Sequence, residues 1–362
     1  MTPSRPMTPS PPTATVTGAA QAFPATVSQR DLWDRYAGPR YGGSRWARRI
    51  FLSAGVERRH TVANPCVEDV SGWSTGARMI RYAAEAVPLG KEAVTGALGA
   101  ADLDASDVGL LAVVSCTGYS TPGLDIKVAA DVGMADGVQR LLIGHMGCYA
   151  ALPALGAVAD YVVARRRPAV LLCLELASLH AQPPAPDVDQ IVTHALFSDA
   201  AAAVVVSPRA TSRAADLTVV DVVARTDRAT ADHMTWDITD LGFRMGLSRR
   251  VPDVLAAHVR PLVSDLLAGN GVEPADVDGW AVHPGGPRIL DVVADRLDLP
   301  GGALDASRAV LADHGNASSA TVLVVLDEIR RTRPPRPGRY VVALAFGPGL
   351  TLYGVLLRAD GV

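Results

Sequence analysis

Long apolar runs alternate with helical repeats over most of the chain. An amphipathic repeat between Met79 and Leu103 predicts a long helix, and apolar runs predict buried strands at 107–116, 168–175 and 196–206. Helices that alternate with apolar strands are typical of α/β proteins. We therefore expect an α/β fold.

The pattern of the first half recurs in the second. The strand predicted at 275–283 resembles the one at 106–114, and the strand at 339–346 corresponds to 168–175. An apolar helix follows Asn316 as another follows Cys148, and all three correspondences have an offset of about 170 residues. This spacing predicts an internal duplication into two similar halves.

The duplication suggests boundaries along the chain. Residues 1–25 are rich in Pro, Thr and Ser and lack periodicity, so we expect a disordered tail there. An N-terminal half at 26–210 and a C-terminal half at 211–362 follow. Cys148 falls in the first half and Asn316 in the second.

Composition excludes several classes of function. The 362 residues are 49% hydrophobic with a formal net charge of −3, which gives no argument for nucleic-acid binding. The four cysteines are dispersed without a CxxC pair, which predicts reduced thiols in a cytoplasmic protein and no metal site. No apolar run is long enough for a membrane span, and the N-terminus lacks a signal-peptide pattern.

Cys148 occupies a suggestive position. It follows an apolar run that ends in small residues, and apolar residues from Leu152 onward keep helical spacing. We therefore expect Cys148 near the N-terminus of a buried helix, where unpaired N–H groups and the helix dipole favour a thiolate. The alternative is a small core cysteine without chemistry.

Two residues of the second half complete a possible reactive set. His283 ends a predicted strand before Pro284-Gly-Gly-Pro287, and Asn316 starts the helix equivalent to that of Cys148. If the halves pack with pseudo-twofold symmetry, the two helix starts meet near the centre. An imidazole activates a thiol, and an asparagine can donate to a developing oxyanion.

These residue types fit two chemistries, acyl transfer to water as in a thiol hydrolase, or acyl transfer to carbon. The second needs His and Asn to stabilise a thioester enolate formed by decarboxylation, and it needs water excluded. The apolar surroundings of all three residues favour it.

Four segments together resemble the signature segments of type III polyketide synthases, the chalcone-synthase superfamily. They are Met146–Cys148, His283–Leu290, Gly315–Ala320 and Phe346–Thr351, in the same order, within a similarity that covers about residues 28–358. The resemblance implies a thiolase-like fold with five αβαβα layers and a homodimer. It also implies a cavity at the end of a tunnel that admits the pantetheine arm of coenzyme A.

The resemblance also implies the reaction. Cys148 would carry the acyl starter from an acyl-CoA, and His283 and Asn316 would promote decarboxylation of malonyl-CoA. The resulting enolate would extend the starter by Claisen condensation, and the chain would cyclise to a pyrone, a resorcinol or another aromatic ring. No metal or organic cofactor is implied.

Further residues match positions that bind substrate in this family. Phe197 and Phe243 match gatekeepers between tunnel and cavity, Arg49 falls at a coenzyme A phosphate position, and Arg288 is a second contact suggested by its position alone. A core role for the phenylalanines and Cys116, and a solvated role for the arginines, are the alternatives. The remaining positions that would bind substrate are Cys116, Thr121, Ala177, Leu179, His180, Ser318 and Pro348. Of these, Thr121 would reach across the dimer into the neighbouring cavity.

Two rivals share the fold. A ketoacyl-ACP synthase of the fatty-acid initiating kind usually has a Gln-Ala-Asn segment after its histidine, whereas Pro-Gly-Gly-Pro follows His283. A non-catalytic thiolase-fold partner subunit often lacks one of the three residues, and this chain has all three.

Overall fold

A single mixed sheet runs through the molecule and consists of two half-sheets joined at its centre. The computed structural model describes residues 13–183, 185, 188–208 and 216–360. The strand order is β11-β12-β13-β8-β1-β7-β6-β4-β5. The first half contributes β1 (Thr15–Ala22), β4 (Leu110–Val114), β5 (Gln139–Ile143), β6 (Ala169–Leu176) and β7 (Asp199–Ser207). The second contributes β8 (Leu217–Thr226), β11 (Val277–Val282), β12 (Tyr340–Gly347) and β13 (Thr351–Ala359).

The half-sheets repeat one topology, in agreement with the predicted duplication. In each, a parallel pair (β4 with β6, β11 with β12) continues through an antiparallel strand (β7, β13) to a second antiparallel strand (β1, β8). β1 and β8 meet in the middle through only two residue pairs, Thr15 with Thr218 and Val16 with Leu217. The narrow junction lets the half-sheets diverge and enclose a layer between them.

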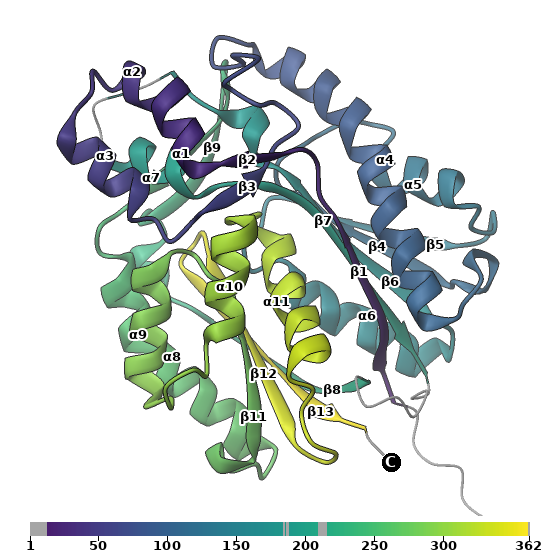
Figure 1. The fold of residues 1–362 in the computed structure, drawn as a ribbon. Helices are drawn as coiled ribbons and strands as arrows, with labels where there is room; N and C mark the ends of the chain where they lie inside the picture. Colours follow the sequence, from purple (N-terminus) through teal and green to yellow (C-terminus); the bar gives the residue numbers. More distant parts are fainter. Residues whose placement is uncertain (1–12, 184, 186–187, 209–215, 361–362) are drawn as a thin grey trace, which may run out of the picture.

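Helices form the remaining layers (Figure 1). α4 (Thr75–Ala101) and α5 (Leu124–Val132) cover the outer face of the first half-sheet, and α8 (Val251–Gly269) with α9 (Pro287–Leu297) covers that of the second. α6 (Ala151–Arg165) and α11 (Ser319–Thr332) contact strands of both half-sheets. The predicted αβαβα arrangement is therefore confirmed.

The central helices are buried because their sequences are apolar around most of their circumference. Leu155 and Val158 of α6 and Val325 of α11 have no exposed surface, and they belong to one cluster with residues of both half-sheets. Each of these helices therefore has a fixed start, and those starts carry Cys148 and Asn316.

The predicted disordered tail is wrong for part of its length. Residues 1–12 lie outside the described residues, but Thr15–Ala22 forms β1 beside β7 at the centre of the sheet. Gly18 sits directly against the backbone of α4, where a Cβ would lie 2.3 Å from the oxygen of Ala97. Such close packing needs small residues, which is why the strand lacks the bulky apolar pattern on which the prediction relied.

The shorter helices and strands formed by residues 26–60 and 188–196 lie together at the upper left in Figure 1, and the other short elements lie elsewhere along the chain. The helices are α1 (Gln29–Leu32), η1 (Trp33–Ala37), α2 (Gly38–Arg40), α3 (Arg45–Leu52), α7 (Val188–Leu196) and α10 (Asp305–His314). The strands are β2 (Thr26–Ser28), β3 (Arg58–His60), β9 (Met234–Thr239) and β10 (Gly242–Leu247). The short 3-10 turns are η2 (Ala105–Asp107), η3 (Ala177–His180), η4 (Arg228–Thr230) and η5 (Pro274–Asp276). None of the described helices is long and apolar enough to cross a membrane.

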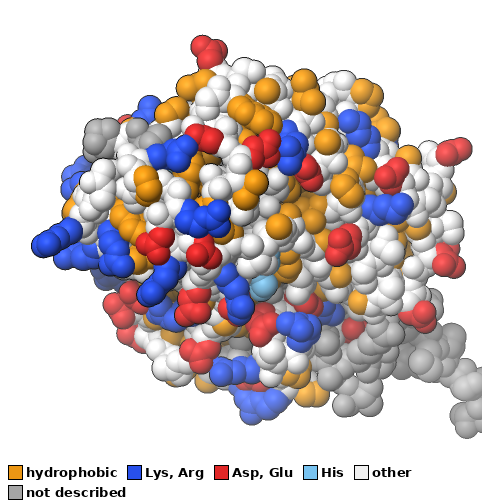
Figure 2. All heavy atoms as spheres, turned by 45° about the horizontal axis from the view of Figure 1, so that its top comes forward, with side chains coloured by type: hydrophobic (Ala, Val, Ile, Leu, Met, Phe, Trp, Pro, Cys, Tyr) orange, Lys and Arg blue, Asp and Glu red, His pale blue; other side chains and the backbone are white. Residues whose placement is uncertain are grey.

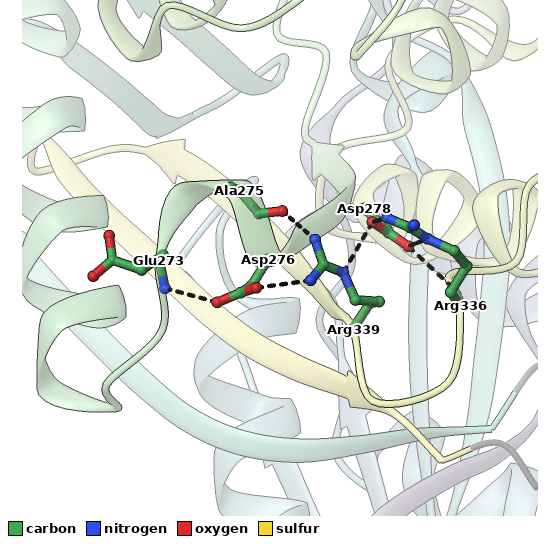
Figure 3. A network of polar contacts seen from close by, with 6 residues as sticks. All are labelled: Glu273, Ala275, Asp276, Asp278, Arg336 and Arg339. Atoms are coloured by element: carbon green, nitrogen blue, oxygen red, sulfur yellow. Dashed lines mark hydrogen bonds and ion pairs between the residues drawn. The ribbon is translucent and has the colours of Figure 1, made fainter.

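A polar network fixes the start of β11 against the turn before β12 (Figure 3). Arg336 donates from Nε and Nη2 to Asp278 at 2.8 and 2.7 Å, and Arg339 donates to Asp276 at 2.7 Å. These arginines, Arg336 first, lower the pKa of Asp278 to about 2. The network sets the register of β11, the strand that ends next to His283.

Candidate active site

Cys148 lies in a tight turn immediately before α6, as its position in the sequence predicts. Gly147 has a positive φ of 78°, and a Cβ there would lie 2.7 Å from the ring of Pro348. Only glycine fits both conditions without strain. The turn buries Cys148, which is 6% exposed, against the loop after β12.

His283 follows β11 directly. Its backbone N–H donates to the oxygen of Leu344 at 2.8 Å, which continues the β11–β12 pairing to the histidine itself. The edge of its ring meets Phe346 at 5.9 Å between centroids. The side chain is 1% exposed, yet neither ring nitrogen has a hydrogen-bond partner among the described residues. A buried imidazole with two unpartnered nitrogens is a group prepared for a ligand.

Asn316 is held by backbone and side chain together. Its N–H donates to the oxygen of Leu196 at 2.9 Å, and its own oxygen accepts from the N–H of Ser198 at 2.9 Å. Its carboxamide oxygen accepts from the N–H of Ser318 at 2.8 Å. Because that oxygen is occupied, the NH₂ group is the part of the side chain left to donate to a substrate.

The structure brings these three side chains to one cavity of about 440 Å³. Cys148 comes from the first half of the chain, and His283 and Asn316 come from the second. Most of the lining is apolar, so a substrate that fills the cavity displaces water from all three groups. The residues that complete the wall next to them include Leu196, Met245, Ile289 and Phe346.

Burial opposes the thiolate predicted from the helix start. It raises the pKa of the Cys148 thiol to about 11, although the hydroxyl of Ser318 donates to the sulfur at 3.5 Å. Burial also lowers the pKa of His283 to about 3. The free site therefore holds a neutral thiol and a neutral imidazole, and loading an acyl group requires a proton to move from the sulfur.

A second thiol lies beside the first. The sulfur of Cys116 is 3.5 Å from the Ser318 hydroxyl and 3.4 Å from the Glu175 carboxylate, which also accepts from the Cys116 N–H at 3.0 Å. Burial and then the charge of Glu175 raise the pKa of Cys116 well above its usual value. Ser318 thus links two buried thiols, of which only Cys148 lines the large cavity.

Of the two predicted gatekeepers, one lines the cavity. Phe197 does so, just after α7, whereas Phe243 stacks on His180 at 4.3 Å between ring centroids and lies outside the cavity wall. Met245, two residues further along β10, lines the cavity instead. The sequence prediction chose Phe243 because it is aromatic. Met245 lies two residues further along the same strand, so its side chain is on the same face, and it is Met245 that forms part of the cavity wall.

Rings form a block beside Phe197. Trp236 meets the ring of Phe197 at 6.2 Å and that of His180 at 5.5 Å. Phe197 and Trp236 also line a second, smaller cavity of about 70 Å³, together with Ala177 and His180. The block therefore separates the two spaces and limits what the larger one can hold.

His180 has a structural place in this block. Its Nε2 is 2.7 Å from the oxygen of Thr117, and its Nδ1 accepts from the N–H of Phe243 at 2.9 Å. Burial lowers its pKa to about 4. A neutral ring that donates at one nitrogen and accepts at the other is fully satisfied without a substrate.

The remaining predicted residues are scattered around the site. Leu179 is fully buried in the core under α4 and reaches neither cavity, and Thr121 is exposed in the single chain. Arg288 lines the large cavity, and Arg49 is exposed on α3 beside residues that line it. Arg249 lines it too and was not predicted, although its place in an Arg-Arg pair just before Val251 was a usable signal.

Among the described residues, no three His, Cys, Asp or Glu side chains gather closely enough to hold a metal ion. The cavity presents a thiol, a neutral imidazole and a carboxamide donor. Placed on one apolar cavity of a duplicated thiolase-like fold, they define an acyltransferase that forms carbon–carbon bonds.

The chain belongs to the chalcone and stilbene synthase family. Residues 56–209 match the model of the N-terminal domain of chalcone and stilbene synthases, and residues 219–360 match that of the C-terminal domain. It is a type III polyketide synthase of the bacterial branch, as its sequence predicts.

Several characterised proteins are similar over most of their length. A 1,3,6,8-tetrahydroxynaphthalene synthase of Streptomyces peucetius is 38% identical over 86% of this chain and 83% of its own. An alpha-pyrone synthesis polyketide synthase-like protein of Mycobacterium tuberculosis is 30% identical over 96% of this chain and 92% of its own. The crystal structure of a brown-algal enzyme, PKS-I of Ectocarpus siliculosus, superposes with a TM-score of 0.89 at 26% identity, covering 97% of this chain and 100% of the other.

Proposed function

We propose that this polyketide synthase uses Cys148 as its acyl carrier and His283 with Asn316 as its decarboxylation pair. The enzyme takes an acyl-CoA starter, extends it with malonyl-CoA and releases a cyclised pyrone, resorcinol or related aromatic product. The observation that carries the assignment is the convergence of the three side chains, from both halves, on one buried cavity.

Loading couples acyl transfer to proton transfer. The Cys148 sulfur attacks the starter thioester carbonyl, a carbon–sulfur bond forms, and the bond to coenzyme A breaks. His283 takes the thiol proton and returns it to the departing coenzyme A sulfur. The low pKa of the buried imidazole favours return of the proton to the leaving thiolate and opposes its removal from Cys148, so the sulfur loses its proton only as the starter binds and reacts.

Extension depends on the two donors. The His283 N–H and the Asn316 NH₂ donate to the thioester oxygen of malonyl-CoA and stabilise negative charge there as CO₂ leaves. The electron pair of the broken bond forms an enolate, whose carbon attacks the Cys148 thioester. A carbon–carbon bond forms and the sulfur is released, ready to recapture the lengthened chain. Malonyl decarboxylation drives the cycle, so no cofactor beyond coenzyme A thioesters is required.

Charge at the cavity wall supports coenzyme A as the carrier of both substrates. Arg249 and Arg288 line the cavity, and Arg49 is exposed on the neighbouring helix α3. Guanidinium groups bind phosphates through paired, charge-assisted hydrogen bonds. The pantetheine arm then extends past Phe197 and Met245 toward Cys148.

The same proposal includes a cytoplasmic homodimer. β5 is the edge strand of the sheet, and Leu141 and Leu142 on it are 39% and 47% exposed. Tyr119, near Thr121, is 63% exposed. An edge with exposed apolar side chains is a surface that proteins normally cover. A second copy that covers it brings Thr121 toward the neighbouring subunit.

The test is product formation from hexanoyl-CoA and malonyl-CoA, followed by mass spectrometry. Cys148→Ala is expected to abolish extended products while malonyl-CoA is still decarboxylated to acetyl-CoA, because His283 and Asn316 remain. Asn316→Ala should slow that decarboxylation by a factor of about 100 or more. Cys66→Ala, at a half-buried thiol outside the cavity, is the control. Extended polyketide from the Cys148→Ala protein would refute the assignment.

Alkylation isolates the role of His283. Iodoacetamide should modify Cys148 at pH 7 about ten times more slowly in His283→Ala than in the parent chain, because the base that takes the thiol proton is missing. The difference should shrink as the pH approaches the pKa of about 11 of the thiol, where hydroxide removes the proton directly. Equal rates at pH 7 would show that His283 does not activate the sulfur.

A further inference from the structure

Two histidines form a pair outside the large cavity, and one of them lies close to Asn316 in the chain. His60 ends β3, and His314 ends α10, two residues before Asn316. The Nε2 of His60 lies 2.9 Å from the Nδ1 of His314, so a hydrogen bond joins segments that are 254 residues apart. In Figure 1, α10 lies directly below β3. Neither histidine lines the large cavity, so the pair does not touch a substrate there.

The surroundings of His60 fix the direction of this hydrogen bond. Its Nδ1 lies 3.2 Å from the carbonyl oxygen of Pro24 and 3.2 Å from the hydroxyl of Thr26. Because a carbonyl oxygen only accepts, Nδ1 carries the proton of His60, its Nε2 accepts, and His314 donates from Nδ1. Burial lowers the pKa of His60 to about 4 and also lowers that of His314. Both rings are therefore neutral at neutral pH, as this bond requires.

A third ring holds the two imidazoles in place. Phe23 stacks on His314 at 4.3 Å between ring centroids, with the ring planes 7° apart. It also stacks on His60 at 4.5 Å. A ring packed against both imidazoles restricts their rotation, so the two nitrogens stay aligned for the hydrogen bond.

The histidine pair closes a ring of bonds that includes Asn316. The backbone N–H of His60 donates to the hydroxyl of Ser198 at 2.9 Å, and that hydroxyl donates to the oxygen of His60 at 3.2 Å. The N–H of Ser198 donates to the oxygen of Asn316 at 2.9 Å. From Asn316 the chain leads back through Gly315 to His314, whose ring bonds to that of His60. The bond between the two imidazoles is the one side-chain to side-chain bond of this ring.

Gly315 leaves no room for the ring to adjust. Its φ is 69°, and a Cβ at this position would lie 2.9 Å from the Cβ of Ser198 and 3.1 Å from the oxygen of Leu196. A glycine packed so closely cannot absorb a shift of the helix end. A displacement of His314 is therefore passed on to Asn316.

Two other contacts link the segment of β3 to α10. The N–H of Glu57 donates to the oxygen of Ala312 at 2.8 Å, and Arg58 forms an ion pair with Asp313 in which both side chains are exposed. Acidic and basic side chains are interspersed over the face seen in Figure 2, and water weakens exposed pairs of this kind. Both contacts act before the last residue of α10, so the histidine pair alone acts on His314 itself.

We propose that His60 and His314 are positioning residues for Asn316, and that their hydrogen bond holds its carboxamide where it donates to the thioester oxygen of malonyl-CoA. This inference rests on the proposed function, because it assumes that Asn316 promotes decarboxylation. A donor stabilises developing charge only when it is aligned with the oxygen, so a small displacement of Asn316 slows the reaction. Loading of Cys148 does not use Asn316 and should not depend on the pair.

The test separates the hydrogen bond from the ring. His314→Phe keeps a ring against Phe23 but has no donor, whereas His314→Asn has no ring but places an amide nitrogen where Nδ1 lies. Acetyl-CoA formation from malonyl-CoA is measured for each in the Cys148→Ala background, where the enolate cannot extend a chain. His314→Phe should lower kcat about tenfold and change KM less than twofold, because Asn316 acts on the transition state. His314→Asn should stay within about threefold of the Cys148→Ala chain.

Two controls keep folding from confusing the result. His258→Phe removes another half-buried histidine, whose Nε2 lies 2.9 Å from Asp227, and it should leave acetyl-CoA formation unchanged. Loading is measured in chains that keep Cys148, by intact-protein mass spectrometry after mixing with hexanoyl-CoA. His314→Phe should load at a rate within twofold of the parent chain, which shows that its cavity is intact.

Each other outcome has one meaning. Unchanged kcat in His314→Phe, or the same loss in His314→Asn, would show that the hydrogen bond does not position Asn316. Equal losses of decarboxylation and loading in His314→Phe would indicate a general distortion of the cavity and would also overturn the inference. If the Cys148→Ala chain with both histidines forms no acetyl-CoA, the proposed function itself fails.

Discussion

Ser318 is the residue at which the two halves of the proposed chemistry meet. Its hydroxyl donates to the sulfur of Cys148, and its backbone N–H fixes the carboxamide of Asn316. The side chain therefore acts on loading, whereas the backbone acts on decarboxylation. Its φ of 47° shows that the surrounding structure holds the residue in an unfavourable conformation.

Ser318→Ala should separate these two roles. Loss of the hydroxyl removes the one side-chain donor that lowers the pKa of Cys148, so acylation by hexanoyl-CoA should slow by a factor of about 10. Decarboxylation of malonyl-CoA should change less than twofold, because the N–H to Asn316 is kept. Ser53→Ala, at the cavity wall away from the sulfur, is the control for both assays. Equal losses in the two assays would contradict this division.

His180 gives a pH dependence to stability. The folded chain holds it neutral down to about pH 4, whereas an unfolded histidine binds a proton near pH 6.5. Its pKa is lowered on folding, so the free energy of unfolding falls as the pH drops from 6.5 to 4, by up to about 3 kcal/mol. His180→Gln should reduce this slope in urea unfolding measured between pH 7 and 4.5, and exposed His145→Gln should not. A slope unchanged in His180→Gln would show that other groups cause it.

At the scale of elements, the end of α7 is the part that holds the site together. Arg59 of β3 donates to the oxygens of His194 and Phe197 at 2.7 and 2.8 Å and to that of Ala195 at 2.7 Å. Phe197 is in turn bridged to Asn316. A single buried guanidinium thus positions a residue of the cavity wall and, through it, the carboxamide donor.

Arg59→Met should therefore affect stability and chemistry together. Three buried carbonyls lose their donor, so we expect the free energy of unfolding to fall by about 3 kcal/mol in urea titration. Malonyl-CoA decarboxylation should fall at least tenfold, because Asn316 shifts. Arg58→Met is the matched control, since its ion pair with Asp313 is exposed to solvent and contributes little to stability. Decarboxylation at the parent rate in Arg59→Met would show that β3 does not position Asn316.

Elements with strong apolar periodicity were predictable from the sequence. The long helix before β4, the helix starts at Cys148 and Asn316, and the duplication all follow from such patterns. β1 was missed because a strand packed closely against α4 carries small residues. The burial of Arg59 could not be predicted either, because its partners, the carbonyls of residues 194–197, lie far away in the sequence and leave no local pattern.

The same limit explains what the sequence missed at the site. Which side chains share a cavity depends on strand register, so Met245 and not Phe243 lines the wall with Phe197. The ionisation of Cys148 depends on burial by both halves, which outweighs the local effect of a helix start. Residue types in the sequence therefore indicate the class of reaction, whereas the packing of distant elements determines the cavity wall and the ionisation of Cys148.

At the scale of the whole molecule, the duplication explains why the site lies at the centre. The two halves join through β1 and β8, and this arrangement places their equivalent helix starts beside each other. One of these starts carries Cys148 and the other carries Asn316. All three proposed catalytic residues come from one chain, and a second copy would add only residues of the cavity wall.

The edge strand β5 provides the test of that second copy. Leu142→Arg introduces a charge where we expect an apolar contact between subunits, so sedimentation equilibrium should show a dimer for the parent chain and a monomer for the variant. Val220→Arg, at a similarly exposed apolar position on β8, should stay dimeric. Iodoacetamide should still modify Cys148 in the monomer, because its groups come from one chain, while the product distribution should change as Thr121 of the neighbour is withdrawn. A monomeric parent chain, or an unchanged dimer of Leu142→Arg, would show that β5 is not the interface.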